Sequence, residues 1–180
     1  MNGTSPILTK KELRLLIKER KNQLSTDECI RFSNLIMYKI EQCEAFRTAQ
    51  SVLCYWSLSD EVRTIDFIDK HWQSKKIYLP VVVGDSFELH LFEGKEKMKK
   101  GAFGIAEPLG EICKEDVDVA IVPGVAFDKK GHRLGRGKGF YDRFLSGTNA
   151  YKIGIAFRCQ LVNDMPVDAW DIIMDEVLTE

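Results

Sequence analysis

The chain has 180 residues, of which 26 are Lys or Arg and 27 are Asp or Glu, so its formal net charge is −1. With 44% hydrophobic residues, this length predicts a single globular domain over residues 1–180, with a core that needs neither disulfides nor a structural metal. The composition excludes collagen-like and disordered proteins.

The cysteines, the hydrophobic runs and the charge balance exclude further classes of protein. Five scattered cysteines without a Cys-x-x-Cys pair predict neither a disulfide framework nor a zinc site. No run approaches the roughly 20 apolar residues of a membrane helix, and the N-terminus is charged too early for a secretory signal. Balanced charge argues against a general nucleic-acid-binding protein. We expect a cytoplasmic monomer that contacts neither nucleic acid nor membrane.

The first half of the chain predicts two helices followed by strands. Capping boxes that begin at Thr9 and Ser25, each followed by an apolar stripe, predict helices over residues 9–24 and 25–43. Residues 51–56 have the composition of a strand, and a third helix is expected to begin near Thr64. Residues 76–83 then predict a buried strand, joined through a turn at Gly84-Asp85 to an alternating strand over residues 86–92.

The second half contains a long loop and two further strands. Residues 93–115 lack a clear period and predict a surface loop that could carry binding groups. Strands are expected over residues 118–124 and 151–157, the latter as the final central strand, with a helix over residues 140–145 between them. Strands that alternate with helices predict a mainly parallel sheet.

The strongest chemical signal is a glycine-rich basic loop between a buried strand and a helix. Gly135, Gly137 and Gly139 alternate with Arg136 and Lys138, a pattern that lets the backbone approach phosphate oxygens while cations neutralise them. A loop at the carboxyl end of a parallel strand is a common ligand site in α/β proteins. The segment matches neither of the two commonest phosphate-binding fingerprints, and a solvated flexible loop is the alternative.

An acid follows this loop directly. Asp142 beside a phosphate site would be unfavourable without a screening cation, and Mg²⁺ bridging carboxylate and phosphate oxygens would supply one. Asp142 is therefore a candidate Mg²⁺ ligand. An ordinary first-turn acid that interacts with the helix dipole is an equally good interpretation.

The segment RLGRGKGFYDRFL, with PGVAFDKKG before it, resembles the signature of the 5-formyltetrahydrofolate cyclo-ligase family, also called 5,10-methenyltetrahydrofolate synthetases. The resemblance extends to Lys10 and Arg14 in the first helix, to YWSLSDEVRT, to GIAEP and to the acidic C-terminus. It implies a single three-layer α/β/α domain with a mainly parallel sheet. It also implies an enzyme that converts 5-formyltetrahydrofolate and MgATP to 5,10-methenyltetrahydrofolate, ADP and phosphate, by phosphorylation of the formyl oxygen and attack by N10.

The resemblance also implies roles for individual residues. The ATP-binding set would be Lys10, Arg14, Arg133, Leu134, Gly135, Arg136, Gly137, Lys138, Gly139, Phe140 and Tyr141. Within that set the catalytic pair would be Arg136 and Lys138. The Mg²⁺ ligands would be Asp142 and Asp171. The folate-binding residues would be Trp56, Glu61, Phe103 and Phe140.

Several of these positions have plainer alternatives, and some depart from the family pattern. Lys10 and Arg14 could be solvated charges, Glu61 a loop acid, and Trp56 a core aromatic. Phe103 could likewise anchor its loop. Phe140 replaces a frequent tyrosine, and a shorter acid and an indole, Asp168 and Trp170, stand where relatives often have Glu and His. The alternative functions are a folate-binding protein without turnover and an RNA-binding module that uses RLGRGK.

Overall fold

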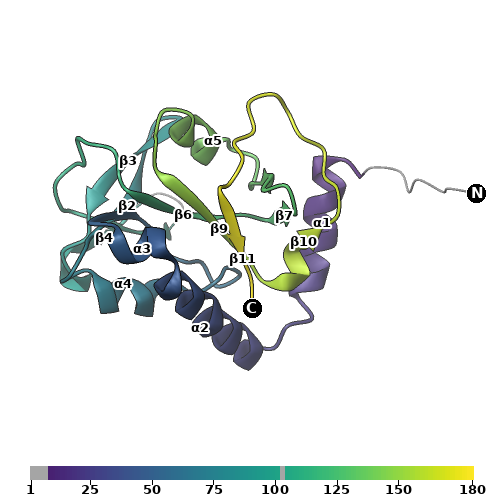
Figure 1. The fold of residues 1–180 in the computed structure, drawn as a ribbon, viewed down its shortest axis with the longest axis horizontal. Coiled ribbons are helices and arrows are strands. Elements are labelled where there is room, and N and C mark those ends of the chain that lie inside the picture. The colour runs from purple at the N-terminus through teal and green to yellow at the C-terminus, as the bar shows by residue number, and fades with distance from the viewer. Residues whose placement is uncertain (1–7, 102–103) are drawn as a thin grey trace, which may run out of the picture.

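A six-stranded sheet forms the centre of the structure, a computed structural model that describes residues 8–101 and 104–180 (Figure 1). In spatial order its strands are β11 (Glu176–Leu178), β9 (Tyr151–Ile155), β6 (Val119–Pro123), β1 (Ser51–Leu53), β2 (Lys76–Val83) and β3 (Ser86–Leu91). Neighbouring strands are parallel except for the antiparallel pair β2 and β3. The predicted mainly parallel sheet is confirmed.

The strand boundaries correct several expectations. The turn at Gly84-Asp85 is confirmed, because Val83 pairs with Ser86 across it. The first strand ends at Leu53 rather than at residue 56, since the following residues leave the sheet to line a cavity described below. The strand predicted over residues 151–157 is central but not final, because β11 pairs with it from the C-terminal end of the chain.

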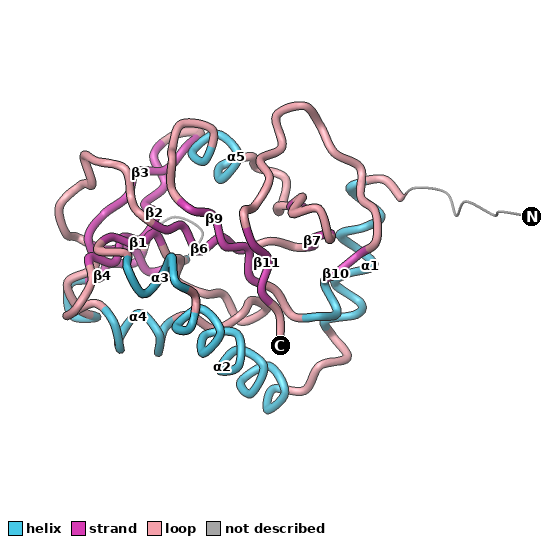
Figure 2. The backbone as a smooth tube through the Cα atoms, viewed as in Figure 1, coloured by secondary structure: helices cyan, strands magenta, loops and turns pink. Residues whose placement is uncertain are grey.

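Three helices cover one face of the sheet: α2 (Thr26–Gln42), α3 (Glu44–Thr48) and α4 (Ile65–His71), which lie together in Figure 2. The capping box at Ser25 begins α2 as predicted. Ile40 and Phe67 from these helices join sheet residues such as Ile121 in one buried cluster. The five-residue α3 was not predicted, because a helix of that length shows too little of a 3.6-residue period.

The opposite face is covered differently. The six-residue helix α5 (Phe140–Leu145) packs there, and its Leu145 shares a buried cluster with Val122 of β6 and with Phe127 and Met174. Figure 1 shows α5 on the other side of the sheet from α2 and α4. On this side of the sheet the described helix is therefore the short α5, whereas α2, α3 and α4 cover the opposite side.

The first helix packs away from the main sheet. α1 (Lys10–Lys21), capped at Thr9 as predicted, buries Leu13 and Ile17 against Ala126 and Leu134. These partners belong to a small three-stranded sheet that the sequence did not predict. Its strands, in spatial order, are β10 (Leu161–Val162), β7 (Ala126–Asp128) and β8 (Arg133–Leu134). Together α1 and this sheet fix the position of the chain just before the glycine-rich loop.

The segment expected to lack regular structure contains a short hairpin. Within residues 93–115, the 3₁₀ helix η1 (Lys95–Lys97) is followed by β4 (Met98–Lys100), which pairs with β5 (Ala106–Pro108). Three-residue strands carry too little alternation to be detected from sequence. A further 3₁₀ turn, η3 (Arg158–Gln160), precedes β10. Among the described residues, no helix combines the length and hydrophobicity needed to cross a membrane.

Candidate active site

A cavity of about 640 Å³ opens at the carboxyl ends of β1 and β6. From β1 the chain runs one way across the sheet, to β2 and β3, and from β6 it runs the other way, to β9 and β11. Such a reversal of strand order leaves a crevice between the two strands, and ligands of α/β proteins bind in crevices of this kind. Tyr55 and Trp56 follow β1 into the cavity, and Pro123 and Gly124 end β6 there.

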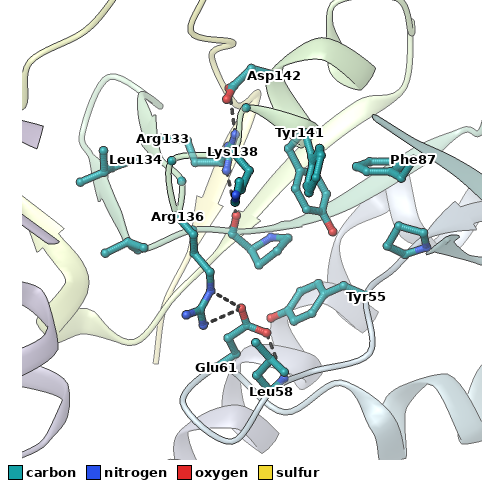
Figure 3. Close-up of a pocket in the computed structure, with 18 of the residues that line it drawn as sticks. Tyr55, Leu58, Glu61, Phe87, Arg133, Leu134, Arg136, Lys138, Tyr141 and Asp142 are labelled. Carbon is teal, nitrogen blue, oxygen red and sulfur yellow. Dashed lines mark hydrogen bonds and ion pairs between the residues drawn. The ribbon is translucent and has the colours of Figure 1, made fainter. Parts of the chain in front are cut away.

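The predicted site residues converge on this one cavity. The residues of the predicted set that line it are Lys10, Arg14, Trp56, Glu61, Arg133, Leu134, Gly135, Arg136, Gly137, Lys138, Gly139, Phe140, Tyr141, Asp142 and Asp171. They come from α1, from the β1–α4 loop, from β8, from the glycine-rich loop with α5, and from the segment before β11. Phe103 lies outside the described residues. In Figure 3, Arg133, Arg136 and Lys138 lie on one side and the rings of Tyr55, Phe87 and Tyr141 on the other.

Backbone conformation explains why two of the loop glycines are needed. Gly137 has φ +103° and Gly139 has φ +68°, both in the left-handed region that other residues rarely adopt. Gly139 is also the N-cap of α5. The loop therefore turns sharply into the helix, and Lys138, between the two glycines, is exposed at the cavity.

Arg133 is buried in the cavity wall, with 5% of its surface exposed. Its Nη2 donates to Asp142 Oδ1 at 2.8 Å, and its Nη1 donates to the Pro123 carbonyl at 3.3 Å. The guanidinium lies over the Tyr141 ring, 5.5 Å from the ring centre. Its Nε is buried and has no hydrogen-bond acceptor within the described part of the chain. Arg133 therefore orients Asp142 and keeps one donor available.

Arg14 connects α1 to the glycine-rich loop. Its Nε donates to the carbonyl oxygen of Gly135 at 2.9 Å. The contact joins residues 121 positions apart in the chain and holds the first helix at the edge of the cavity. Arg14 is therefore not a merely solvated charge.

Lys10, one turn before Arg14 on α1, bridges two acids at the cavity. Its Nζ lies 2.6 Å from Asp171 Oδ2 and 2.7 Å from Asp168 Oδ2. Burial alone would raise the pKa of Asp171, but hydrogen bonds from Lys10 and from the Asp168 backbone outweigh it, so that this pKa is lowered. Burial likewise opposes the charge of Lys10, but the two carboxylates raise its pKa. Both members of the pair are therefore ionised at neutral pH.

Arg136 pairs with acids of the facing β1–α4 loop. Its Nη2 lies 2.7 Å from Asp60 Oδ1. The same Nη2 lies 3.0 Å from Glu61 Oε1, and Glu61 also accepts a hydrogen bond from the Leu58 N–H at 3.0 Å (Figure 3). Burial alone would lower the pKa of Arg136, but the two acids raise it. Asp60 also pairs with Lys21 at the end of α1, at 2.8 Å. A predicted phosphate-binding residue and a predicted folate-binding residue are thus bound to each other.

The remaining wall is aromatic and aliphatic. Trp56 packs near Phe92, with ring centres 5.9 Å apart, and Tyr141 meets the edge of Phe87 at 5.1 Å. Aliphatic lining comes from Leu79, Pro80 and Val82 of β2. Burial raises the pKa of Tyr55 and of Tyr141 well above the usual tyrosine value, so both phenols stay protonated. This wall can receive a flat ring system.

Sequence reasoning missed several cavity residues. Phe87 lies on a hairpin strand that carries no chemical motif, and Glu107 lies in GIAEP, which the resemblance covered without giving that acid a role. Glu107 is buried, with 6% exposed, and accepts a hydrogen bond from the Val82 N–H at 3.4 Å. Asp60, which pairs with Arg136 but does not line the cavity, was given no role by the sequence. Phe87 and Glu107 are brought to the cavity by strand pairing, which no local pattern signals.

The two predicted metal ligands line the same cavity, Asp142 beside Arg133 and Asp171 beside Lys10. Within the described ranges there is no group of three or more His, Cys, Asp or Glu side chains that could hold a metal by themselves. Any divalent cation here would need further oxygen ligands from a bound phosphate chain or water.

Comparison with known proteins identifies the family. The model of the 5-formyltetrahydrofolate cyclo-ligase family matches residues 7–180. The solved 5,10-methenyltetrahydrofolate synthetase of Aquifex aeolicus is 37% identical, with a TM-score of 0.85 over 94% of this chain and 89% of that one. The 5-formyltetrahydrofolate cyclo-ligase of Escherichia coli K12 is 32% identical over 91% of this chain and 96% of its own. The 5-formyltetrahydrofolate cyclo-ligase of Mus musculus is 31% identical over 95% of this chain and 93% of its own. The chain belongs to the 5-formyltetrahydrofolate cyclo-ligase family.

Proposed function

We propose that the protein cyclises 5-formyltetrahydrofolate to 5,10-methenyltetrahydrofolate with conversion of ATP to ADP and phosphate. The observation that carries the proposal is the two-sided cavity, in which a glycine-rich cationic loop faces an aromatic and aliphatic wall. A polyanion and a flat reduced pterin have these two complementary surfaces. Membership of the cyclo-ligase family supports the assignment of both ligands.

On the cationic side, the triphosphate would lie along the glycine-rich loop. Backbone N–H groups from Leu134 to Tyr141 would approach its oxygens, with Lys10 and Arg14 reaching them from α1. Arg136 and Lys138 would contact the transferred phosphoryl group, whose charge spreads over its outer oxygens in the transition state. Arg133 would act mainly by orienting Asp142, with its buried Nε as one further donor.

On the opposite side, the folate would lie against the aromatic wall. Trp56 and Phe140 would pack on its rings, and the Glu61 carboxylate would accept hydrogen bonds from the N–H groups of the pterin edge. Glu61 and Arg136 form an ion pair in the free protein. Binding of the substrates would have to separate this pair, because the phosphate chain would bind Arg136 and the pterin would bind Glu61. The proposed contact of Phe103 with folate concerns a residue outside the described ranges.

The chemistry would proceed by activation of a poor leaving group. The formyl oxygen attacks the γ-phosphorus, and the bond from this phosphorus to the bridging oxygen of ADP breaks. N10 would then attack the formyl carbon and lose its proton to solvent, and the bond between this carbon and the phosphorylated oxygen would break to release phosphate. The protein needs to place the two substrates and neutralise charge, and it supplies no nucleophilic side chain.

The carboxylates of Asp142 and Asp171 fit Mg²⁺. They are hard oxygen donors in the same cavity as the phosphate-binding loop, and Mg²⁺ is commonly held by one or two carboxylates together with phosphate oxygens and water. When bound, Mg²⁺ would neutralise phosphate charge and orient the terminal phosphoryl group. Arg133 and Lys10, which pair with these acids in the free protein, would then be available to phosphate oxygens.

A single assay tests the proposed function. Purified protein is mixed with 5-formyltetrahydrofolate and MgATP, and the absorbance of the methenyl product is followed, with omission of ATP as the control. We expect product at a rate proportional to enzyme concentration, and only with ATP. Folate binding by calorimetry without ATP-dependent product would instead indicate the folate-binding alternative.

A further inference from the structure

A short turn before β11 is held at the rim of the cavity by hydrogen bonds and an ion-pair bridge. The Asp171 N–H donates to the Asp168 carbonyl at 3.0 Å, and the Asp168 N–H donates to Asp171 Oδ2 at 2.8 Å. Lys10 Nζ lies within 2.7 Å of a carboxylate oxygen of both acids, which ties the turn to the start of α1. The residues enclosed by this turn therefore have a defined position.

Trp170 lies inside the turn and is 70% exposed, although it lines the cavity. An indole usually buries most of its large apolar surface, so this exposure is unusual at a cavity wall. Within the described part of the chain, no aromatic ring packs against it. An anchored turn that holds an open ring face at a ligand cavity is well suited to stacking a planar ligand group.

The position of the turn indicates which substrate would meet this ring. Asp171 is adjacent to Trp170 and lies beside Lys10, on the side of the cavity proposed to hold the triphosphate. The aromatic wall proposed for folate is built from other segments, around Trp56 and Phe87. The phosphate-binding residues account for the triphosphate but leave the base of the nucleotide without a partner.

We propose that Trp170 is the stacking platform for the purine base of ATP. This inference rests on the proposed function, since it needs ATP in this cavity. The indole face covers the base, and in the free protein the Lys10 bridge places the turn so that a phosphate chain beside it can reach the glycine-rich loop. Stacking on an aromatic side chain is open to any base, because every base has a π-face, and it strengthens binding substantially.

The test compares ATP with inorganic tripolyphosphate, which has the charge of the phosphate chain but no base. Dissociation constants are measured by calorimetry in Mg²⁺ for wild type, Trp170→Ala and Trp170→Phe. We expect Trp170→Ala to weaken ATP about tenfold, with tripolyphosphate unchanged and with most of the ATP affinity restored in Trp170→Phe. Val167→Ala, at an exposed residue outside the cavity lining, is the matched control and should leave both constants unchanged.

Two outcomes would overturn the inference. Equal weakening of ATP and tripolyphosphate in Trp170→Ala would mean that the side chain only positions Asp171, and unchanged ATP affinity would mean that it contacts no base. Fluorescence gives an independent readout, because ATP should quench the indole emission of wild type but cause a much smaller change in Trp170→Phe.

The fate of the inference can be separated from that of the proposed function. If wild type forms no methenyl product but the ATP-dependent quench is lost in Trp170→Phe, the inference holds and the proposed function fails. If wild type forms product and Trp170→Ala binds ATP normally, only the inference fails.

Discussion

The two cations of the glycine-rich loop, Arg136 and Lys138, differ in their ion pairs. Arg136 is bound to two carboxylates, whereas the ammonium group of Lys138 makes no ion pair within the described ranges and is exposed at the cavity. A cation without a competing anion can meet a phosphoryl group at little cost. Lys138 is therefore the residue whose removal should affect phosphoryl transfer most cleanly.

We expect Lys138→Ala to lower kcat/KM for ATP about 100-fold, because loss of one charged donor to a developing transition-state charge costs roughly 2.7 kcal/mol. The circular dichroism spectrum and the melting temperature should stay unchanged, since the side chain is exposed. Steady-state kinetics at saturating folate measures the effect. Lys129→Ala, an exposed lysine outside the cavity lining, is the control, and equal activity of the two variants would remove Lys138 from the reaction.

The Lys10 and Asp171 pair makes a prediction about pH. The folded-state pKa of Asp171 is lowered below its unfolded value, so the pair stabilises the fold above that unfolded value and loses this contribution as the pH falls through the folded pKa. We expect Lys10→Met to reduce the free energy of unfolding by about 1 kcal/mol near neutral pH. The difference from wild type should shrink as the pH is lowered through the acidic range.

Urea denaturation at several pH values measures this difference. Lys11→Met is the control, because Lys11 is exposed next to Lys10 and forms no ion pair within the described residues, so its effect should be small at every pH. A destabilisation by Lys10→Met that is the same at neutral and acidic pH would contradict the role given to the carboxylates.

The family resemblance indicated which residues belong to the site, but it did not indicate which of them contact each other. It indicated that Glu61 and Arg136 belong to the site, but their ion pair joins positions 75 residues apart, and no local spacing encodes such a contact. The same holds for Arg14, whose hydrogen bond to Gly135 spans 121 residues. Residue types can indicate chemistry, whereas partners depend on the completed fold.

The two loops that carry these residues are joined by Arg136 in the free protein. The β1–α4 loop contributes Asp60 and Glu61, and the glycine-rich loop contributes the guanidinium. Hydrogen bonds from Lys21 and Arg136 keep the pKa of Asp60 low although burial alone would raise it. Because Asp60 is outside the proposed ligand contacts, it can be changed to weaken this link selectively.

We expect Asp60→Asn to lower the KM for ATP two- to threefold, because Arg136 would lose one of the anions that compete with phosphate. The expected factor corresponds to roughly 0.5 kcal/mol, the usual worth of a half-exposed ion pair. Steady-state kinetics at fixed folate measures it. Asp66→Asn, at an exposed acid on α4, should have no effect. A higher KM for ATP in Asp60→Asn would show that the acid supports the nucleotide site instead.

Among the elements, those with strong local signals were predictable. The capping boxes at Thr9 and Ser25 begin α1 and α2 at the expected residues, because an N-cap depends only on the first turn of a helix. Strands of two or three residues have no such signal. β8 and β10 form because each pairs with β7. Phe127 of β7 is the partner of Arg133 in β8 on one side and of Leu161 in β10 on the other.

The arrangement of the whole molecule explains where the cavity lies. The sequence indicated a mainly parallel sheet, which is confirmed, and a ligand loop at the carboxyl end of a strand; the glycine-rich loop lines the cavity, and its binding of a ligand stays a prediction. It did not indicate that β6 lies next to β1, although that neighbourhood creates the crevice between the two halves of the sheet. Nor did it indicate β11, which comes after the acidic turn that contains Asp171 and pairs with β9.

The central claim is that one cavity holds both substrates in reacting positions. A crystal structure of the protein with a non-hydrolysable ATP analogue, Mg²⁺ and 5-formyltetrahydrofolate tests it most directly. We expect the triphosphate on the glycine-rich loop, the pterin near Trp56, and the formyl oxygen about 3–3.5 Å from the γ-phosphorus. A nucleotide seated elsewhere, with residues 133–141 free of phosphate, would contradict the account.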